Sequence, residues 1–390
     1  MRRHSRALAS LGVACLAALA VAGCSASKSS SSSSSALTVS GGTLRIYLSE
    51  PSDLSSDPVA QDVVHAEQMA FSSHAPSVKD FKLALVPVAY KTLSDNARAA
   101  IIDATTIAYL GEIAPGDSDQ TTGITNAQDV LQVSPTDGAL ELGQSTPAVS
   151  GGIKSYFEQY STYGRTFARV VPSGAEEAKA QVAEMKSLGA KSLYVSQDGS
   201  DYGRALADAI SVDASSAGIT AAKSLSSADA VFYGAESPAA AAKFFNHAAS
   251  AAPNAKLFGP SSLNSSAFTS ALSSSVHNLY VSIPGYLPKD LPAEGRAFDA
   301  AFKSAYGHTP NTVAIFGYEA MSALLRVLAD EGDKANNRAD VVHAFLKQNK
   351  VSSVLGTYSI DSYGNTSLDA FVFARPRGGK LVPFAAAPQS

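Results

Sequence analysis

Six short segments rich in Ser, Gly, Asp and Pro hold the residues of this chain that best fit the binding of a small polar molecule. Each follows a short apolar run, and its hydroxyls, carboxylates and backbone amides are groups that can hydrogen-bond a ligand. The same residue types also build ordinary turns, so each segment alone has a purely structural explanation. The segments are residues 48–51, 112–118, 134–138, 196–203, 234–238 and 259–263.

The sequence lacks the residue patterns of familiar enzymes. It has no Gly-x-Ser-x-Gly, no His-Glu-x-x-His, no phosphate-binding loop and no Gly-x-Gly-x-x-Gly, and its seven histidines are scattered. The adjacent carboxylates Glu176 and Glu177 fall in the first turn of a predicted helix, where the helix dipole favours negative charge. We therefore expect no catalytic activity, no cofactor and no metal.

The N-terminal residues predict export and a lipid anchor. Three arginines within the first six residues precede an apolar stretch, residues 7–22, which is short for a membrane span and typical of a secretory signal peptide. The sequence Val-Ala-Gly-Cys that ends at Cys24 resembles a bacterial lipobox, in which the cysteine thiol takes up a diacylglyceryl group. Residues 1–23 are thus predicted to be a lipoprotein signal peptide, with an ordinary cleavage site beside an incidental cysteine as the alternative.

A serine-rich linker, residues 24–42, separates Cys24 from the rest of the chain. Its unbroken run of serines at 29–35 cannot bury apolar surface, so we expect it to be disordered. The other cysteine, Cys15, would leave with the signal peptide, so the mature body has no disulfide and no cysteine-based metal site. The mature chain holds 27 basic against 34 acidic residues. Because nucleic-acid binding needs clustered positive charge, this excess of acidic residues gives no electrostatic support for it.

The elements that must position the six segments alternate between strands and helices. A chain of 390 residues is too long for one ordinary core, so we expect two domains. Strands separated by helices of 10–15 residues predict an α/β fold with two parallel sheets, and such sheets bind ligands at the carboxyl ends of their strands. Strands are expected at 43–48, 81–86, 106–110, 130–133, 192–196, 230–233, 256–258 and 279–282, and helices at 175–188, 203–217, 238–252, 265–272 and 317–330.

In several places the body resembles the type I periplasmic binding proteins, in particular the branched-chain amino-acid binding subunits of ABC importers. The clearest stretch is residues 109–142, with Leu-Gly, a Ser-containing loop and an apolar strand that ends in Ser134-Pro135. Further similarities are Phe-Ala-Arg at 167–169, Gly-Tyr-Glu-Ala-Met at 317–321 and Asp-Ser-Tyr-Gly-Asn at 361–365. The resemblance covers residues 43–388 and implies two Rossmann-like lobes joined by a three-crossing hinge.

The resemblance also implies lobe boundaries, since members of the family cross between lobes three times. The crossings would fall near Pro172, Pro284 and Gly356. Lobe one would comprise residues 43–172 plus 285–355, and lobe two residues 173–284 plus 356–390.

Ligand-binding positions follow from the same resemblance, but several carry unexpected residues. Pro115 and Asp137-Gly138 stand where the family has Ser and Thr, Glu236 replaces a tyrosine, and Ser261 replaces an acidic residue. Such changes imply a ligand other than leucine, isoleucine or valine, and acidic positions in the cleft would favour a cationic or polyhydroxylated one. The candidate ligand-binding residues are Ser49, Pro115, Gly116, Asp117, Ser118, Thr136, Asp137, Gly138, Tyr202, Glu236 and Ser261.

The function that the resemblance implies is capture of a small polar ligand, an amino acid or a related metabolite, between two closing lobes. Delivery to an ABC permease would follow, from a monomer held on the extracytoplasmic face of the bacterial cell membrane by lipid on Cys24. The alternatives are a ligand-sensing lipoprotein that partners a membrane receptor or kinase, and a non-transport surface protein on the same fold.

Overall fold

The computed structural model describes residues 38–73, 77–149, 157 and 164–388. The predicted signal peptide, Cys24 and most of the linker lie outside these residues. Among the described residues no helix is long and apolar enough to cross a membrane.

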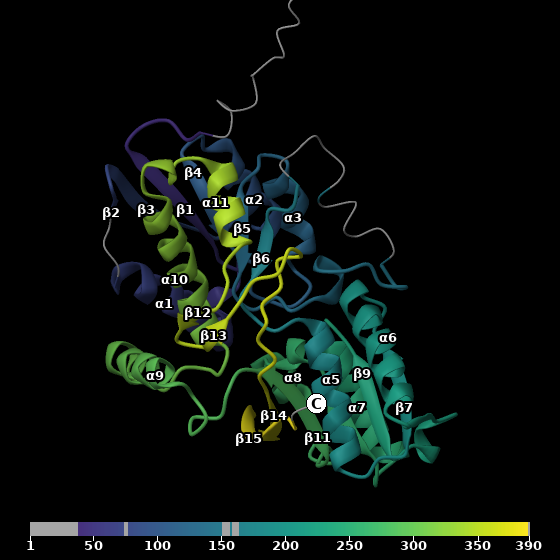
Figure 1. Cartoon of the computed structure of the whole chain (residues 1–390). Helices are drawn as coiled ribbons and strands as arrows, with labels where there is room; N and C mark the ends of the chain where they lie inside the picture. The colour runs from purple at the N-terminus through teal and green to yellow at the C-terminus, as the bar shows by residue number, and fades with distance from the viewer. Residues whose placement is uncertain (1–37, 74–76, 150–156, 158–163, 389–390) are drawn as a thin grey trace, which may run out of the picture. The chain divides into compact units, whose positions relative to one another are not determined.

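The first sheet has six strands in the order β2-β3-β1-β4-β5-β6, all parallel except the short β2. Alternation in β1 places Leu44, Ile46 and Leu48 in one core and Tyr47 in another on the opposite face. Helices α1, α10 and α11 cover the first face and α2 the second (Figure 1). The strands are β1 (Thr43–Ser49), β2 (Ser77–Val78), β3 (Phe81–Val88), β4 (Thr106–Leu110), β5 (Leu131–Ser134) and β6 (Phe167–Arg169); the helices are α1 (Pro58–Ser73), α2 (Leu93–Ile102), α3 (Asp119–Asn126), α10 (Ala314–Glu331) and α11 (Arg338–Phe345).

The second sheet has seven strands in the order β15-β14-β11-β10-β9-β7-β8. Helices α5 and α6 cover one face, while α7 and α8 cover the other (Figure 1). The strands are β7 (Ser192–Gln197), β8 (Thr220–Ala221), β9 (Ala230–Gly234), β10 (Lys256–Gly259), β11 (Leu279–Pro284), β14 (Phe371–Arg377) and β15 (Lys380–Ala386); the helices are α5 (Gly174–Ser187), α6 (Asp201–Ser216), α7 (Pro238–Ala251) and α8 (Ser266–Ala271).

These two sheets confirm the predicted α/β class, and the predicted strands and helices all appear with ends shifted by up to three residues. The sequence patterns missed α1, α2 and α9 (Ala293–Tyr306), and they missed the antiparallel pair β14–β15 that extends the second sheet.

The chain passes between the two sheets after β6, after β11 and before β14. A small antiparallel pair, β12 (Val351–Ser353) and β13 (Gly356–Tyr358), precedes the last passage. Ile360 and Leu368 still pack in the core of the first sheet, and β14 then joins the second sheet. The lobe boundaries expected from the sequence stay a prediction.

Candidate functional site

Loops at the carboxyl ends of both sheets meet at Gly116. This glycine lies in the loop after β4 at a φ of +98°, and a Cβ built on it would lie 3.3 Å from the Tyr202 Cβ and 3.5 Å from a Glu236 carboxylate oxygen. Tyr202 lies in the first turn of α6, which follows β7, and Glu236 follows β9. The tertiary structure therefore brings together three of the predicted site residues from distant parts of the chain.

Asp137 is fully buried in the loop after β5 and organises the neighbouring loop. Its carboxylate accepts hydrogen bonds from the backbone N–H groups of Gly116 (2.8 Å), Ser118 (2.8 Å) and Ala139 (3.0 Å). The adjacent Gly138 is packed so closely that an added Cβ would lie 3.0 Å from the Pro172 carbonyl oxygen. The parallel pairing of β4 with β5 places the loops that follow these two strands side by side. The Asp137 carboxylate can therefore reach the N–H groups of Gly116 and Ser118.

The second sheet carries a similar arrangement around Asp198, which follows β7. Its carboxylate accepts from the backbone N–H groups of Ser200 (3.0 Å), Glu236 (2.9 Å) and Ser237 (2.9 Å). These bonds join the ends of β7 and β9. Partial burial raises the pKa of Asp198, but the Ser200 hydroxyl (2.6 Å) and the three backbone N–H groups together lower it below its ordinary value.

Tyr202 belongs to a buried network centred on Glu177. The Glu177 carboxylate accepts from the Ser261 N–H (2.6 Å), the Ser261 hydroxyl (2.9 Å) and the Ser282 hydroxyl (2.6 Å). The Tyr202 hydroxyl lies 3.5 Å from this carboxylate and 3.4 Å from the Ser261 hydroxyl. The two adjacent glutamates therefore differ in environment. Glu176 forms an ion pair with Lys179 (2.8 Å) on the surface, whereas Glu177 is buried and links α5 to Ser261 and Ser282 at two strand ends of the second sheet.

Ser49 lies in a separate buried network at the carboxyl end of β1. Its hydroxyl donates to Glu112 (2.7 Å) and accepts from the Asn96 side chain (2.9 Å), while the Tyr109 hydroxyl donates to the other Glu112 oxygen (2.6 Å). Burial raises the pKa of Glu112 to about 7, against the lowering effect of these donors.

Further carboxyls close to Asp137 have raised pKa values. Burial and the charges of Asp137, Glu112 and Glu236 raise the pKa of Asp117 to about 8. Burial, followed by the charge of Asp137, raises that of Asp119 to about 7. These loops are a strongly acidic environment.

A small cavity of about 90 Å³ lies between loops of the two sheets. This volume falls short of the roughly 300 Å³ at which ligand pockets begin. Three predicted residues line it, Pro115, Thr136 and Ser261. The remaining lining residues are Asp57, Val59, Ala60, Ile113, Ala114, Ser262, Asn264, Ser265, Pro284 and Val313.

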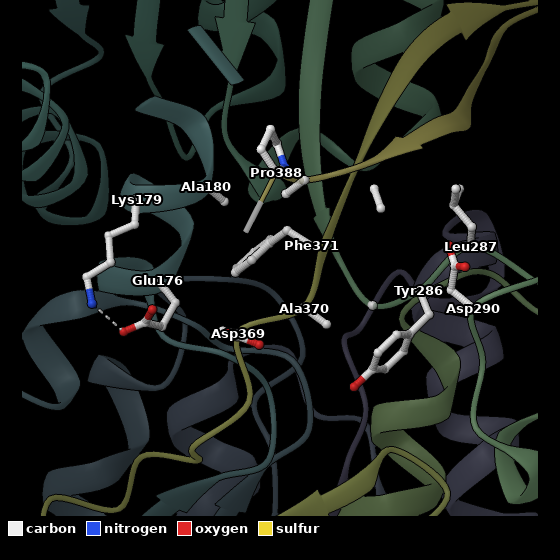
Figure 2. A pocket seen from close by; sticks show the side chains of 13 residues that line it. Glu176, Lys179, Ala180, Tyr286, Leu287, Asp290, Asp369, Ala370, Phe371 and Pro388 are labelled. Atoms are coloured by element: carbon white, nitrogen blue, oxygen red, sulfur yellow. Dashed lines mark hydrogen bonds and ion pairs between the residues drawn. The ribbon is translucent and has the colours of Figure 1, made fainter. Parts of the chain in front are cut away.

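A larger pocket of about 410 Å³ lies where the chain passes between the sheets after β11 and before β14 (Figure 2). Tyr286 and Phe371 line it, and the Glu176–Lys179 ion pair lies at its side. None of the predicted ligand-binding residues lines this pocket.

The ligand-binding residues expected from the sequence did not include Glu112, Glu177, Asp198, Asn264 or Asp57. Four of them carried a usable signal. Glu112 and Asp198 lie inside two of the six segments, Asn264 directly follows another, and Asp57 precedes a proline that starts a helix. Glu177 carried none, because a glutamate in a first helical turn is ordinarily exposed.

Comparison with known proteins agrees with this architecture. Residues 219–380 match a family model described as periplasmic binding protein. A leucine-binding protein from Thermotoga maritima superposes with a TM-score of 0.71 over 89% of this chain and 99% of its own, at 18% sequence identity. The chain folds as a type I periplasmic binding protein.

Two further solved structures share this fold. A branched-chain amino-acid transporter substrate-binding protein from Streptococcus pneumoniae, in complex with isoleucine, has a TM-score of 0.64 at 16% identity and covers 89% of this chain and 100% of its own. A solute-binding protein of an ABC transporter from R. palustris, in complex with benzoate, has a TM-score of 0.65 at 16% identity, covering 89% and 96%. No protein of a curated set matches the chain by sequence.

Proposed function

We propose that this type I periplasmic-binding-protein fold is an extracytoplasmic solute-binding protein that captures a small polar ligand between its two lobes and delivers it to an ABC importer. The observation that carries the proposal is the meeting of strand-end loops from both sheets at Gly116, Tyr202 and Glu236. A ligand held there would contact both lobes and stabilise their closure.

Lipid on Cys24 would hold the protein at the membrane, beside the permease that receives the ligand. The lipobox-like sequence before Cys24 and the serine-rich linker after it support this arrangement. The 18 linker residues from Ser25 to Gly42 would reach about 23 Å on average if they form a flexible coil.

The test is to purify the full chain from membranes in detergent, identify co-purifying small molecules by mass spectrometry, and measure their effect on the melting temperature. We expect a bound solute that raises the melting temperature of the wild type and binds more weakly to Glu236→Gln. Glu176→Gln is the control, because Glu176 lies at the other pocket, and it should bind as the wild type does. A chain that carries no solute and is stabilised by none across a broad metabolite panel would overturn the proposal.

A further inference from the structure

Backbone N–H donors at the ends of the strands are already occupied by carboxylates of the chain itself. Asp137 takes three of them in lobe one, Asp198 takes three in lobe two, and Glu177 takes that of Ser261. At the start of α1, which borders the small cavity, Asp57 takes the N–H groups of Val59 (2.9 Å) and Ala60 (3.2 Å). These are the groups that would otherwise receive an anion at a helix N-terminus.

The hydroxyls of the same loops also donate inward. Ser134 donates to the Glu112 carbonyl (2.7 Å), Thr136 to the Ile113 carbonyl, and Ser262 to the Ala235 carbonyl (2.5 Å). The buried cation Arg169 donates to the Asp137 carbonyl (3.3 Å), to the Ala139 carbonyl (2.6 Å) and to Asn365 (2.6 Å). The lining residues of the small cavity include no lysine and no arginine.

We infer that Asp137 is a specificity-determining residue, which fills the anion position of the cleft so that the chain takes a neutral or cationic solute rich in N–H or O–H donors and without a carboxylate. This inference rests on the proposed function and names the ligand class for the same cleft.

The physical reason is the cost of a second carboxylate beside the first. An incoming carboxylate would find its donors taken and would lie close to the carboxyls of Asp137, Asp117 and Glu236, so its lost hydration would not be replaced. Ammonium and hydroxyl groups would instead meet oxygen acceptors. The structural neighbours were solved with isoleucine and with benzoate, both of which carry a carboxylate.

Chemical rescue tests the role of Asp137. Asp137→Ala removes the internal carboxylate and leaves the Gly116, Ser118 and Ala139 N–H groups open. We expect its melting temperature to fall by several degrees and to recover by at least 2 °C in 100 mM sodium acetate relative to 100 mM sodium chloride. Wild type should show no such difference. Asp137→Asn is the matched control, because its amide still fills the space and should block acetate.

Equal responses of Asp137→Ala to acetate and chloride would overturn the role of Asp137 as the occupant of an anion position. If the alanine variant does not fold, the wild-type measurement below decides the question.

The ligand class is tested on the wild type with two matched pairs of solutes, in each of which only one member carries a carboxylate: leucine against leucinol, and benzoate against benzylamine. A sugar alcohol is tested as a separate, neutral solute. We expect leucinol or benzylamine to bind at least tenfold more tightly than its carboxylate partner in calorimetry. Tighter binding of the carboxylates would overturn the inference and leave the proposed function standing. Binding of no solute, in this set or in the broad panel, would overturn the proposed function and the ligand class with it, while acetate rescue would still report on Asp137.

Discussion

Glu112 is a carboxyl held almost completely inside the fold at the carboxyl edge of the first sheet, where the Ser49 and Tyr109 hydroxyls donate to it. Because burial raises its pKa to about 7 from an ordinary 4.5, the folded chain keeps a proton on Glu112 across a pH range in which the unfolded chain has released it. Folding therefore takes up a proton at this residue between about pH 4.5 and 7.

Stability should accordingly fall as the pH rises through that window and level off above it. One such group contributes a slope of at most about 1.4 kcal/mol per pH unit in the free energy of unfolding. We expect Glu112→Gln to be less sensitive to pH than the wild type by up to this amount, measured by urea unfolding at pH 5, 6 and 7. Some slope should remain, because Asp119 and Glu141 also have pKa values raised to about 7, mainly by burial.

Glu294→Gln, on the exposed side of α9, is the control for this experiment and should keep the wild-type slope. The same slope in Glu112→Gln as in the wild type would contradict the assignment of a buried, protonated Glu112.

At the residue scale the sequence predicted which loops lie next to each other, but it did not predict the hydrogen bonds between them. The segments 112–118 and 134–138 do lie side by side, as the predicted parallel strands require. Their residue types could not show that the Asp137 carboxylate faces the Gly116 and Ser118 amides, because that depends on the loop conformations after two separate strands. Direct ligand contacts of the candidate residues stay a prediction.

At the scale of elements, α6 packs against the end of β9 through two glycines. A Cβ built on Gly234 would lie only 2.2 Å from the Gly203 carbonyl oxygen. This close approach brings the first turn of α6, with Tyr202, beside the loop that carries Glu236. Local sequence patterns predicted both elements, whereas the need for glycine at their contact comes from the packing.

Gly234→Ala should therefore lower the free energy of unfolding by about 3 kcal/mol, because a methyl group must push α6 away from the sheet. Urea unfolding followed by circular dichroism measures the change. The control is Gly123→Ala within α3, where an added Cβ meets nothing within 4 Å. That substitution should stabilise the chain by up to about 1 kcal/mol through helix propensity. A Gly234→Ala variant as stable as the wild type would show that the helix can shift freely.

At the scale of the whole molecule, side chains from the two sheets' loops also bond directly to each other. Asn264, after β10, donates to the Asn311 side chain (3.1 Å), and the Asn311 N–H is anchored to Asp62 of α1 (2.7 Å). Such a bond exists only while the lobes are together.

Asn264→Ala should shift the balance toward the open form. A net loss of about 1 kcal/mol corresponds to about a fivefold change in the ratio of closed to open molecules. Small-angle X-ray scattering of the ligand-free chain should show a larger radius of gyration for this variant. Asn246→Ala removes two bonds on one side of the second sheet, to the Ala271 carbonyl and from the Ser273 N–H, and should scatter as the wild type does. No difference between Asn264→Ala and the wild type would indicate that this bond does not hold the lobes closed.

Membrane attachment can be tested with the two cysteines of the chain. If Cys24 carries the lipid, Cys24→Ser should move the protein from the detergent phase to the aqueous phase in a phase-partition experiment. Cys15→Ser should leave it in the detergent phase, since Cys15 lies within the predicted signal peptide. Retention of both variants in the detergent phase would show that another feature attaches the protein.

The sequence by itself determined the alternation of strands and helices, the need for two sheets and the cysteine-free body, because periodicity, chain length and composition are local or summed properties. Tertiary structure alone decided which carboxylates are buried and which donors they occupy. Glu177 differs from Glu176 only in the face of α5 on which it lies, yet it reaches Ser261 and Ser282, 84 and 105 residues away. Asp137 likewise reaches amides some 20 residues back in the chain. Residues so far apart in the sequence come into contact only when parallel strands bring their carboxyl ends to one edge of a sheet. The ligand class proposed for the cleft follows from the carboxylates that this arrangement brings together.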